Sequence, residues 1–292
     1  MEAKKIVREL SARAFLWSGL CALTRRVLWR DKIAILLYHD PGPEALDRHL
    51  SYLGRFCEFI PLSDIDEPAS GKPRVVITLD DGYAGNAQLL PVFIKHKVRP
   101  TIFVCSGLIG TERQFWFHHE ATQRLGVEML KRLPNEQRLA RLNEHGFTML
   151  GEGKRQALSD EEIAAMKPWV DFQAHTRFHP TLTCCTDAES ESEITISRQE
   201  IEERIGAPCT HFAYPNGNYG PREVAYLKAA GYRTARTCDA GWNDATTDRY
   251  RLKGMPVDDN ASVAWLAAKL TAIPLFARYM MGGSFNGKMP QF

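Results

Sequence analysis

Seven short apolar runs, each containing β-branched residues, recur along the chain and constrain its fold more than any other feature. They lie at residues 32–40, 74–82, 99–107, 169–176, 210–217, 232–241 and 249–259. Helical patterns bounded by turn or capping residues lie between them, at 46–56, 84–96, 160–167, 189–205 and 222–230. Such runs are typical of buried strands, and their alternation with helices predicts an α/β fold with a parallel sheet. Seven strands favour a closed or nearly closed barrel over an open sheet.

No linker or repeat divides the chain. Its 292 residues, 44% hydrophobic and 25% charged, are ordinary for a soluble globular protein, and an α/β barrel alone would use most of this length. We therefore predict a barrel domain at 33–292, preceded by a helical segment at 1–32. Residues 111–158 interrupt the alternation with charged helical sequence, which predicts an insertion above the barrel that flanks a substrate groove.

The N-terminal segment is basic, although the whole chain has a net charge of only +2, which gives no case for a nucleic-acid partner. Residues 1–32 contain eight Lys or Arg against three acids, a net charge of +5. Its apolar stretch, 14–23, is too short to cross a bilayer, which takes roughly 20 residues, and no signal-cleavage site follows it. We favour an amphipathic helix packed on the barrel; the alternative is a helix lying peripherally on an anionic membrane.

The seven cysteines are scattered and include no C-x-x-C pair. This pattern suggests neither a disulfide framework nor a cysteine zinc site. Reduced thiols in a cytoplasmic protein, with or without membrane association, are the simplest interpretation.

Polar side chains follow four of the predicted strands at the point where each strand ends. They are His39-Asp40, Asp80-Asp81, His175 with His179, and the loop Tyr214-Pro215-Asn216. Barrel enzymes place their chemistry at the C-terminal ends of strands. Four such placements at one edge of the sheet therefore predict a functional site.

The adjacent acids Asp80 and Asp81 suggest a division of roles. Neighbouring side chains on a strand point to opposite sides, so one acid can bind a cation while the other stays free as a base. His175 and His179 are spaced to converge on one ion. Two imidazoles and one carboxylate leave coordination positions open, which is typical of a catalytic zinc or other divalent metal site.

Three segments resemble ordered motifs of the polysaccharide deacetylase, or NodB-homology, family. They are "TLDDG" at 78–82, "HTRFHP" at 175–180 and "FAYPNG" at 212–217. The resemblance extends over about residues 33–260. It implies a distorted (β/α) barrel and metal-dependent hydrolysis of N-acetyl groups on sugars.

The resemblance also implies roles for individual residues. Asp80 would be the general base, and Asp81, His175 and His179 would hold one divalent metal ion, with zinc expected ahead of cobalt, nickel or manganese. The loop Tyr214-Pro215-Asn216 would line the acetyl pocket, with the backbone N–H of Asn216 facing the oxyanion.

The chain departs from the family pattern in two places. The usual C-terminal L-x-H motif is absent, since no histidine follows His211. Instead "LLYHD" at 36–40 precedes the acid doublet, as in the rearranged poly-N-acetylglucosamine deacetylase branch that acts on exopolysaccharide, which implies His39 as the general acid. Ala213 stands where many members have an arginine that orients the catalytic acid; Arg251 and Arg236 are the candidates to replace it.

We therefore expect a carbohydrate N-deacetylase that releases acetate from N-acetylhexosamine units of an N-acetylated glycan. One alternative is a deacetylase or amidase acting on a glycolipid precursor or small amide. The other is a metal-containing barrel that binds carbohydrate without turnover. Trp116 could stack on a sugar ring, although core packing is at least as expected, and His118 and His119 are expected on a solvated face.

Overall fold

The computed structural model describes residues 2–68 and 71–271, with side chains from residue 9 onward. All seven predicted runs form parallel strands in one sheet, in the order β7-β6-β5-β4-β3-β1-β8. Their bounds are β1 Ile33–Tyr38, β3 Arg74–Leu79, β4 Thr101–Val104, β5 Asp171–Ala174, β6 His211–Ala213, β7 Thr234–Arg236 and β8 Gly254–Pro256. A short strand, β2 (Glu58–Phe59), pairs with β3 beside this path.

The sheet curls into a nearly closed barrel, which confirms the predicted fold. The first strand, β1, lies between β3 and the last strand, β8. At the other edge, Arg236 of β7 forms a parallel bridge with Leu252, just ahead of β8. The first and last strands in the sequence, β1 and β8, are therefore neighbours in the barrel wall.

The strands are apolar throughout because both of their faces are buried. Ile33 and Ile35 of β1 pack with Val76 and Phe103 in the barrel interior. The alternate residues of β1, such as Leu36, belong to the larger core under the surrounding helices. This alternation follows from the two-residue period of a strand.

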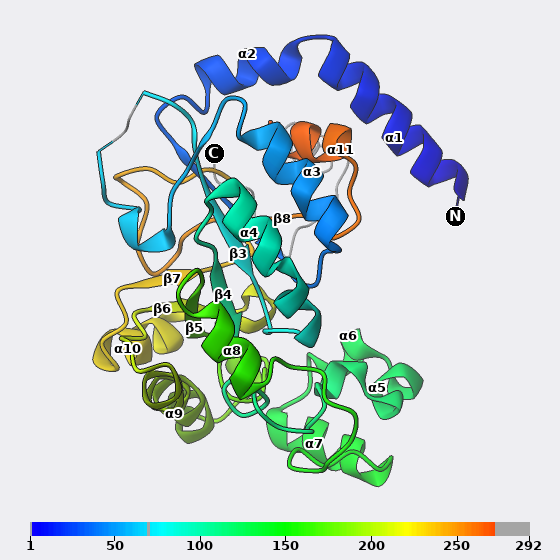
Figure 1. Cartoon of the computed structure of the whole chain (residues 1–292). Helices are drawn as coiled ribbons and strands as arrows, with labels where there is room; N and C mark the ends of the chain where they lie inside the picture. The colour runs from blue at the N-terminus through cyan, green and yellow to red at the C-terminus, as the bar shows by residue number, and fades with distance from the viewer. Residues whose placement is uncertain (1, 69–70, 272–292) are drawn as a thin grey trace.

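Helices cover the outside of the barrel where the sequence predicts them (Figure 1). They are α3 Pro43–Leu53, α4 Leu90–His96, α8 Asp160–Met166, α9 Asp187–Ile205 and α10 Pro221–Ala229. Ser159 and Thr186 begin α8 and α9 with capping boxes. The predicted helix at 84–96 instead begins as the 3-10 helix η2 (Ala84–Leu89). The sequence analysis missed the short helix α11 (Val263–Lys269).

The insertion and the N-terminal helices lie at opposite ends of the molecule in Figure 1. The insertion contains α5 (Glu120–Leu125), α6 (Val127–Leu130) and α7 (Asn135–Glu144), packed around a small apolar core of their own. At the other end, α1 (Glu2–Trp17) packs against α11, and α2 (Leu20–Val27) follows it. Within the described residues, no helix has the length and apolar character needed to span a membrane. The end of the predicted barrel domain, 272–292, lies outside the described residues.

His49 of α3 ties the helix layer to the barrel. Its ring is fully buried; Nε2 donates to the carbonyl oxygen of Ala261 at 2.9 Å, and Nδ1 accepts from the Tyr38 hydroxyl at 3.1 Å. Burial lowers the pKa of His49 below its usual 6.5, outweighing the hydrogen bond to Ala261. The folded protein therefore keeps this imidazole neutral.

We expect His49 to make the fold sensitive to acid. Below about pH 6.5 the unfolded chain binds a proton at this position that the folded chain does not bind, so the free energy of unfolding should fall as the pH falls. Urea unfolding at pH 7.5 and 5.5 should show a smaller loss of stability in His49→Gln than in the parent chain. The exposed His145→Gln is the matched control, and an equal loss in all three proteins would disprove the assignment.

Candidate active site

The strand β3 ends abruptly, and this ending places both acids of the doublet in the barrel mouth. Asp81 and Gly82 have left-handed backbone angles, with φ of 71° and 72°. A Cβ atom at Gly82 would lie 2.7 Å from Cγ1 of Val104, so only glycine fits this turn. Asp80 and Asp81 are consequently both buried, at 4% and 3% exposure.

Left-handed residues other than glycine gather in the loops that follow the strands. Asp81, Thr176, His179 and Asn216 all have positive φ, a conformation that is uncommon for residues with a Cβ. Such backbone strain costs about 1–3 kcal/mol per residue and clusters at functional sites. These are the loops that carry the predicted site residues.

Asp81, His175 and His179 converge as the sequence predicts. One ligand atom from each lies within 4.8 Å of the others. Oδ1 of Asp81 is 3.5 Å from Nε2 of His175 and 3.5 Å from Nε2 of His179. The three side chains follow the C-terminal ends of β3 and β5, the two strands that flank β4 in the sheet.

Hydrogen bonds orient the imidazole of His175 and hold the backbone of His179. Nδ1 of His175 donates to the carbonyl oxygen of Ala213 at 2.7 Å, and this bond turns Nε2 toward Asp81. The backbone N–H of His179 donates to Oγ1 of Thr176 at 3.0 Å, and its carbonyl oxygen accepts from the indole N–H of Trp116 at 2.9 Å. Burial, reinforced by the charge of His175, keeps the pKa of His179 well below its usual value, so this ring is neutral.

The three side chains fit a divalent metal ion. Oδ1 of Asp81 is buried and has no hydrogen-bond partner among the described residues, although it faces two imidazole nitrogens. A buried carboxylate oxygen without a donor is costly, and a cation would satisfy it together with both nitrogens. Two imidazoles and one carboxylate are ligands typical of zinc and related divalent metals.

The carboxylate of Asp80, the other acid, forms an ion pair with Arg236. Nη2 of Arg236 lies 2.5 Å from each of its carboxylate oxygens, and Arg236 is fully buried. Burial favours the protonated acid, but the charges of Arg236 and then His175 outweigh it and lower the pKa of Asp80. Asp80 is therefore an ionised, fixed carboxylate beside the three candidate ligands.

Arg236 occupies the place left open by the residue at 213. In the β6–β7 register, Ala213 lies directly opposite Arg236. The guanidinium thus reaches Asp80 from the neighbouring strand, past a small side chain. The other candidate, Arg251, is half exposed and lies 3.5 Å from Asp248 at the surface.

His39 stands beside Asp80 because β1 and β3 are paired. Tyr38 lies opposite Leu79 in this register, so the next residues, His39 and Asp80, are neighbours. The side chain of His39 is exposed at the mouth, and burial raises the pKa of Asp81 beside it in spite of the opposing charge of His175. The early position of this histidine in the sequence is therefore compatible with the same site.

The remaining predicted residues surround this centre. Tyr214 is buried, and its hydroxyl donates to the carbonyl oxygen of Tyr250 at 3.1 Å. Pro215 is also buried, and Nδ2 of Asn216 donates to Oγ1 of Thr181 at 3.4 Å. Trp116 is 3% exposed, and its indole N–H donates to the carbonyl oxygen of His179.

Two contacts at the rim were not predicted from the sequence. Asp259 accepts hydrogen bonds from the backbone N–H groups of His39 and Asp40, at 3.0 and 3.1 Å. His118 is exposed, as expected. Its Nε2 lies 2.8 Å from the hydroxyl oxygen of Tyr83, and burial lowers its pKa against the opposing charges of Asp81 and Asp40. The signal for Asp259 was present: like Asp81, it is the second acid of a doublet after a strand.

Comparison with known proteins gives the same family as the motifs. The family model described as polysaccharide deacetylase matches residues 67–235, more than half of the chain. YxkH of Bacillus subtilis, which carries the name of a polysaccharide deacetylase, is 23% identical over 189 residues, covering 64% of this chain and 53% of that protein. The chain thus spans about half the length of this curated relative.

Solved structures show the same fold. The Streptococcus pyogenes deacetylase PplD, in complex with acetate, matches with a TM-score of 0.62 at 19% identity, over 82% of this chain and 97% of that one. IcaB from Ammonifex degensii matches with a TM-score of 0.58 at 19% identity, over 83% and 97%. The family match, the shared barrel and the converging motif residues agree, and the chain belongs to the polysaccharide deacetylase family.

Proposed function

We propose that this protein is a metal-dependent carbohydrate deacetylase that hydrolyses N-acetyl groups of N-acetylhexosamine units in a glycan and releases acetate. The observation that carries the proposal is the pairing of two acids with different partners. Asp81 offers a free buried oxygen to a cation beside two histidines, while Asp80 is held ionised by Arg236. Family membership supports the same enzyme class.

The residues divide the reaction between them. A divalent ion held by Asp81, His175 and His179, for which we propose zinc, would supply Lewis-acid polarisation of the amide carbonyl and increase the acidity of water. Asp80 accepts the proton of the attacking water as general base. The backbone N–H of Asn216 is proposed to donate to the oxygen that becomes negative.

His39 completes the proton balance. When the carbon–nitrogen bond breaks, the departing amine needs a proton, and a protonated imidazole beside Asp80 is placed to donate it. Water and the amide thus give acetate and a free sugar amine. Asp259 holds the backbone at His39 and so positions this donor.

Arg236 favours the enzyme over the non-catalytic alternative. The vacancy at Ala213 is the sequence feature that suggests a barrel without turnover, and Arg236 fills it from the neighbouring strand. The glycolipid and small-amide alternatives share this machinery and differ only in substrate. The seven free cysteines support our proposal of a cytoplasmic location.

We expect acetate release from N-acetylglucosamine oligomers to depend on both the base and the ion. Asp80→Asn removes the proton acceptor and should lower kcat by about 100-fold or more. A chelator should abolish activity, and added zinc should restore it. Acetate is measured with an enzyme-coupled assay, together with zinc content.

Asp31→Asn serves as the matched control for Asp80→Asn, because Asp31 is exposed and far from the site in the fold. Full activity in Asp80→Asn would refute its assignment as the base. A parent chain that binds zinc but releases no acetate from any N-acetylated glycan would instead indicate the carbohydrate-binding barrel.

We expect Arg236 to act on turnover more than on substrate binding. Arg236→Lys keeps the positive charge but loses the simultaneous contact with both carboxylate oxygens of Asp80. This variant should lower kcat at least tenfold with little change in KM. Arg236→Met leaves Asp80 as an uncompensated buried charge and should destabilise the protein by about 3–5 kcal/mol, measured by urea unfolding. Arg251→Met is the control, and an equal kcat in Arg251→Met and Arg236→Lys would exclude the positioning role.

We also propose that α2 and the end of α1 bind an anionic membrane surface. Six of the ten large apolar side chains that are exposed in the described chain lie between Leu10 and Leu28, led by Trp17 at 88% and Val27 at 66%. On α2, Leu20, Leu23 and Val27 form one exposed stripe. The opposite side of α2 is buried at Cys21 and Thr24.

Exposed arginines adjoin this apolar stripe. Arg26 and Arg30 lie beside Val27 and Leu28 and are both exposed. An apolar stripe bordered by basic residues is typical of a helix that lies in a lipid interface, and charge complementarity selects anionic lipids. This surface would bring a barrel that acts on membrane-borne glycans close to its substrate.

We expect the protein to sediment with phosphatidylglycerol vesicles and much less with phosphatidylcholine vesicles. Replacing Arg26 and Arg30 by Gln should weaken binding about 30-fold, at about 1 kcal/mol for each basic residue, and salt should weaken it further. Arg124→Gln with Arg141→Gln, on the insertion, is the control. Salt-independent self-association through the stripe, detected by light scattering without vesicle binding, would identify a second copy as the occupant instead.

A further inference from the structure

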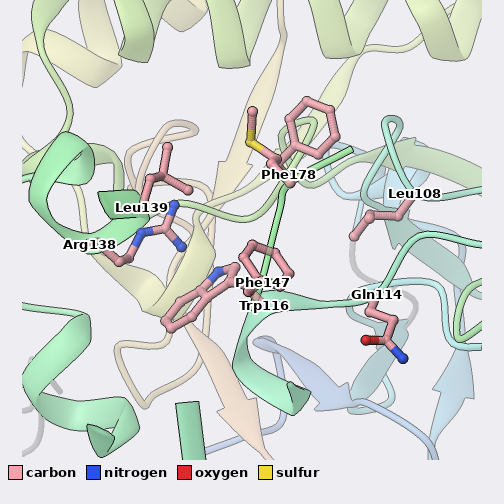
Figure 2. A pocket seen from close by; sticks show the side chains of 8 residues that line it. Leu108, Gln114, Trp116, Arg138, Leu139, Phe147 and Phe178 are labelled. Carbon is pink, nitrogen blue, oxygen red and sulfur yellow. The ribbon is translucent and has the colours of Figure 1, made fainter. Parts of the chain in front are cut away.

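A small pocket lies between the insertion and the loop that carries the metal-ligand histidines (Figure 2). Its walls are mainly apolar and aromatic, and they include Trp116, Phe147 and Phe178. Two polar side chains, Arg138 and Gln114, also line it, and Figure 2 shows them on different sides of the aromatic residues. Most of the lining therefore comes from the insertion.

Arg138 is buried in this pocket and forms no ion pair with a carboxylate of the described residues. It is 3% exposed, and its guanidinium lies 4.4 Å from the centre of the Trp116 ring. Nε and Nη2 both donate to Oδ1 of Asn135, at 3.2 and 2.6 Å. Nη1 is buried and finds no hydrogen-bond acceptor in the described part of the chain.

This arrangement costs folding stability. A buried cation needs an anion or a full set of acceptors to offset its lost hydration, and Arg138 has one neutral acceptor. Burial lowers the pKa of Arg138 to about 10, and the nearby acids Glu193 and Glu189 only partly oppose that shift. A guanidinium with an open N–H donor in a mostly apolar pocket is suited to bind an anion.

Two residues that line the pocket, Trp116 and Phe178, adjoin the proposed active site at His179. Trp116, on which Arg138 stacks, donates its indole N–H to the carbonyl oxygen of His179. Phe178, another wall residue, precedes His179 in the chain. A group bound at Arg138 would therefore contact Phe178, the residue that precedes the proposed metal ligand His179, on the side of the insertion.

We propose that Arg138 binds a carboxylate carried by the glycan substrate, on a sugar unit next to the N-acetylated one. The inference rests on the proposed function, which supplies the glycan. A carboxylate fits better than a phosphate because, within the described residues, Nη1 is the guanidinium nitrogen that lacks an acceptor, and the surrounding walls are mostly apolar. A phosphate dianion would need several donors.

The test compares two sets of N-acetylglucosamine oligomers of equal length. In one set every sugar is neutral; in the other the unit next to the N-acetylated sugar is oxidised to a uronate. The parent chain should deacetylate the acidic oligomer with a kcat/KM at least about tenfold higher, the factor that corresponds to one charge-assisted hydrogen bond. Arg138→Met should remove this preference and keep activity on the neutral oligomer.

Two further variants separate recognition from general charge. Arg138→Lys retains a cation and should keep part of the preference. Arg141→Met removes an exposed arginine one turn further along α7 and should leave the preference unchanged. A preference that is lost equally in Arg138→Met and Arg141→Met would overturn the proposal, because a diffuse positive field would then explain it.

A stability measurement gives a readout that does not depend on turnover. Arg138→Met replaces an uncompensated buried charge with an apolar side chain of similar length, so its Tm should equal or exceed that of the parent chain. The acidic oligomer should raise the Tm of the parent chain more than the neutral one does, and this difference should vanish in Arg138→Met. A large fall in Tm for Arg138→Met would instead assign Arg138 a structural role.

The outcomes distinguish the two proposals. Equal rates and equal Tm shifts with both oligomers would mean that the pocket holds only water; the inference would fail while the deacetylase function would stand. Acetate release from neither oligomer would reject the proposed function. A carboxylate-dependent Tm shift that Arg138→Met abolishes would still support the anion site in that case.

Discussion

The ion pair between Asp80 and Arg236 is the interaction on which the rest of the site depends. Two adjacent carboxylates buried in a barrel mouth repel each other, and one would ordinarily become protonated. Arg236 removes this conflict for Asp80, since its guanidinium contacts both oxygens. Oδ1 of Asp81 has no such partner among the described residues and faces two imidazole nitrogens. The electrostatics therefore divide the doublet into an acid that stays bound to protein and an acid that is available to a cation.

The same ion pair limits the strength of Asp80 as a base. A general base works best when its pKa lies near the working pH, whereas Arg236 holds the pKa of Asp80 low against the effect of burial. Such a carboxylate is always ionised, but it removes protons only from a donor that is already acidic. The proposed chemistry thus needs a cation for two reasons: it satisfies Asp81, and it makes water acidic enough for a weak base.

The sequence predicts the parts of the site that lie at strand ends, and it leaves open the parts that depend on strand register. Asp81, His175 and His179 converge because parallel strands end at one edge, which seven apolar runs are enough to indicate. Arg236 and Arg251 are equal candidates in the sequence, and only the pairing of Ala213 with Arg236 separates them. The contact of Asp259 with the backbone of His39 likewise requires knowing that β8 lies beside β1.

The insertion influences the site through backbone geometry. His179 holds a left-handed conformation, and two hydrogen bonds to its main chain support it, one from its N–H to Thr176 and one from Trp116 of the insertion to its carbonyl oxygen. An insertion that moved away would remove one of these two supports from a metal ligand. At the proposed metal site, ion binding and docking of the insertion would therefore be thermodynamically linked. By reciprocity, a ligand that stabilises the docked insertion would also strengthen the binding of the ion by His179.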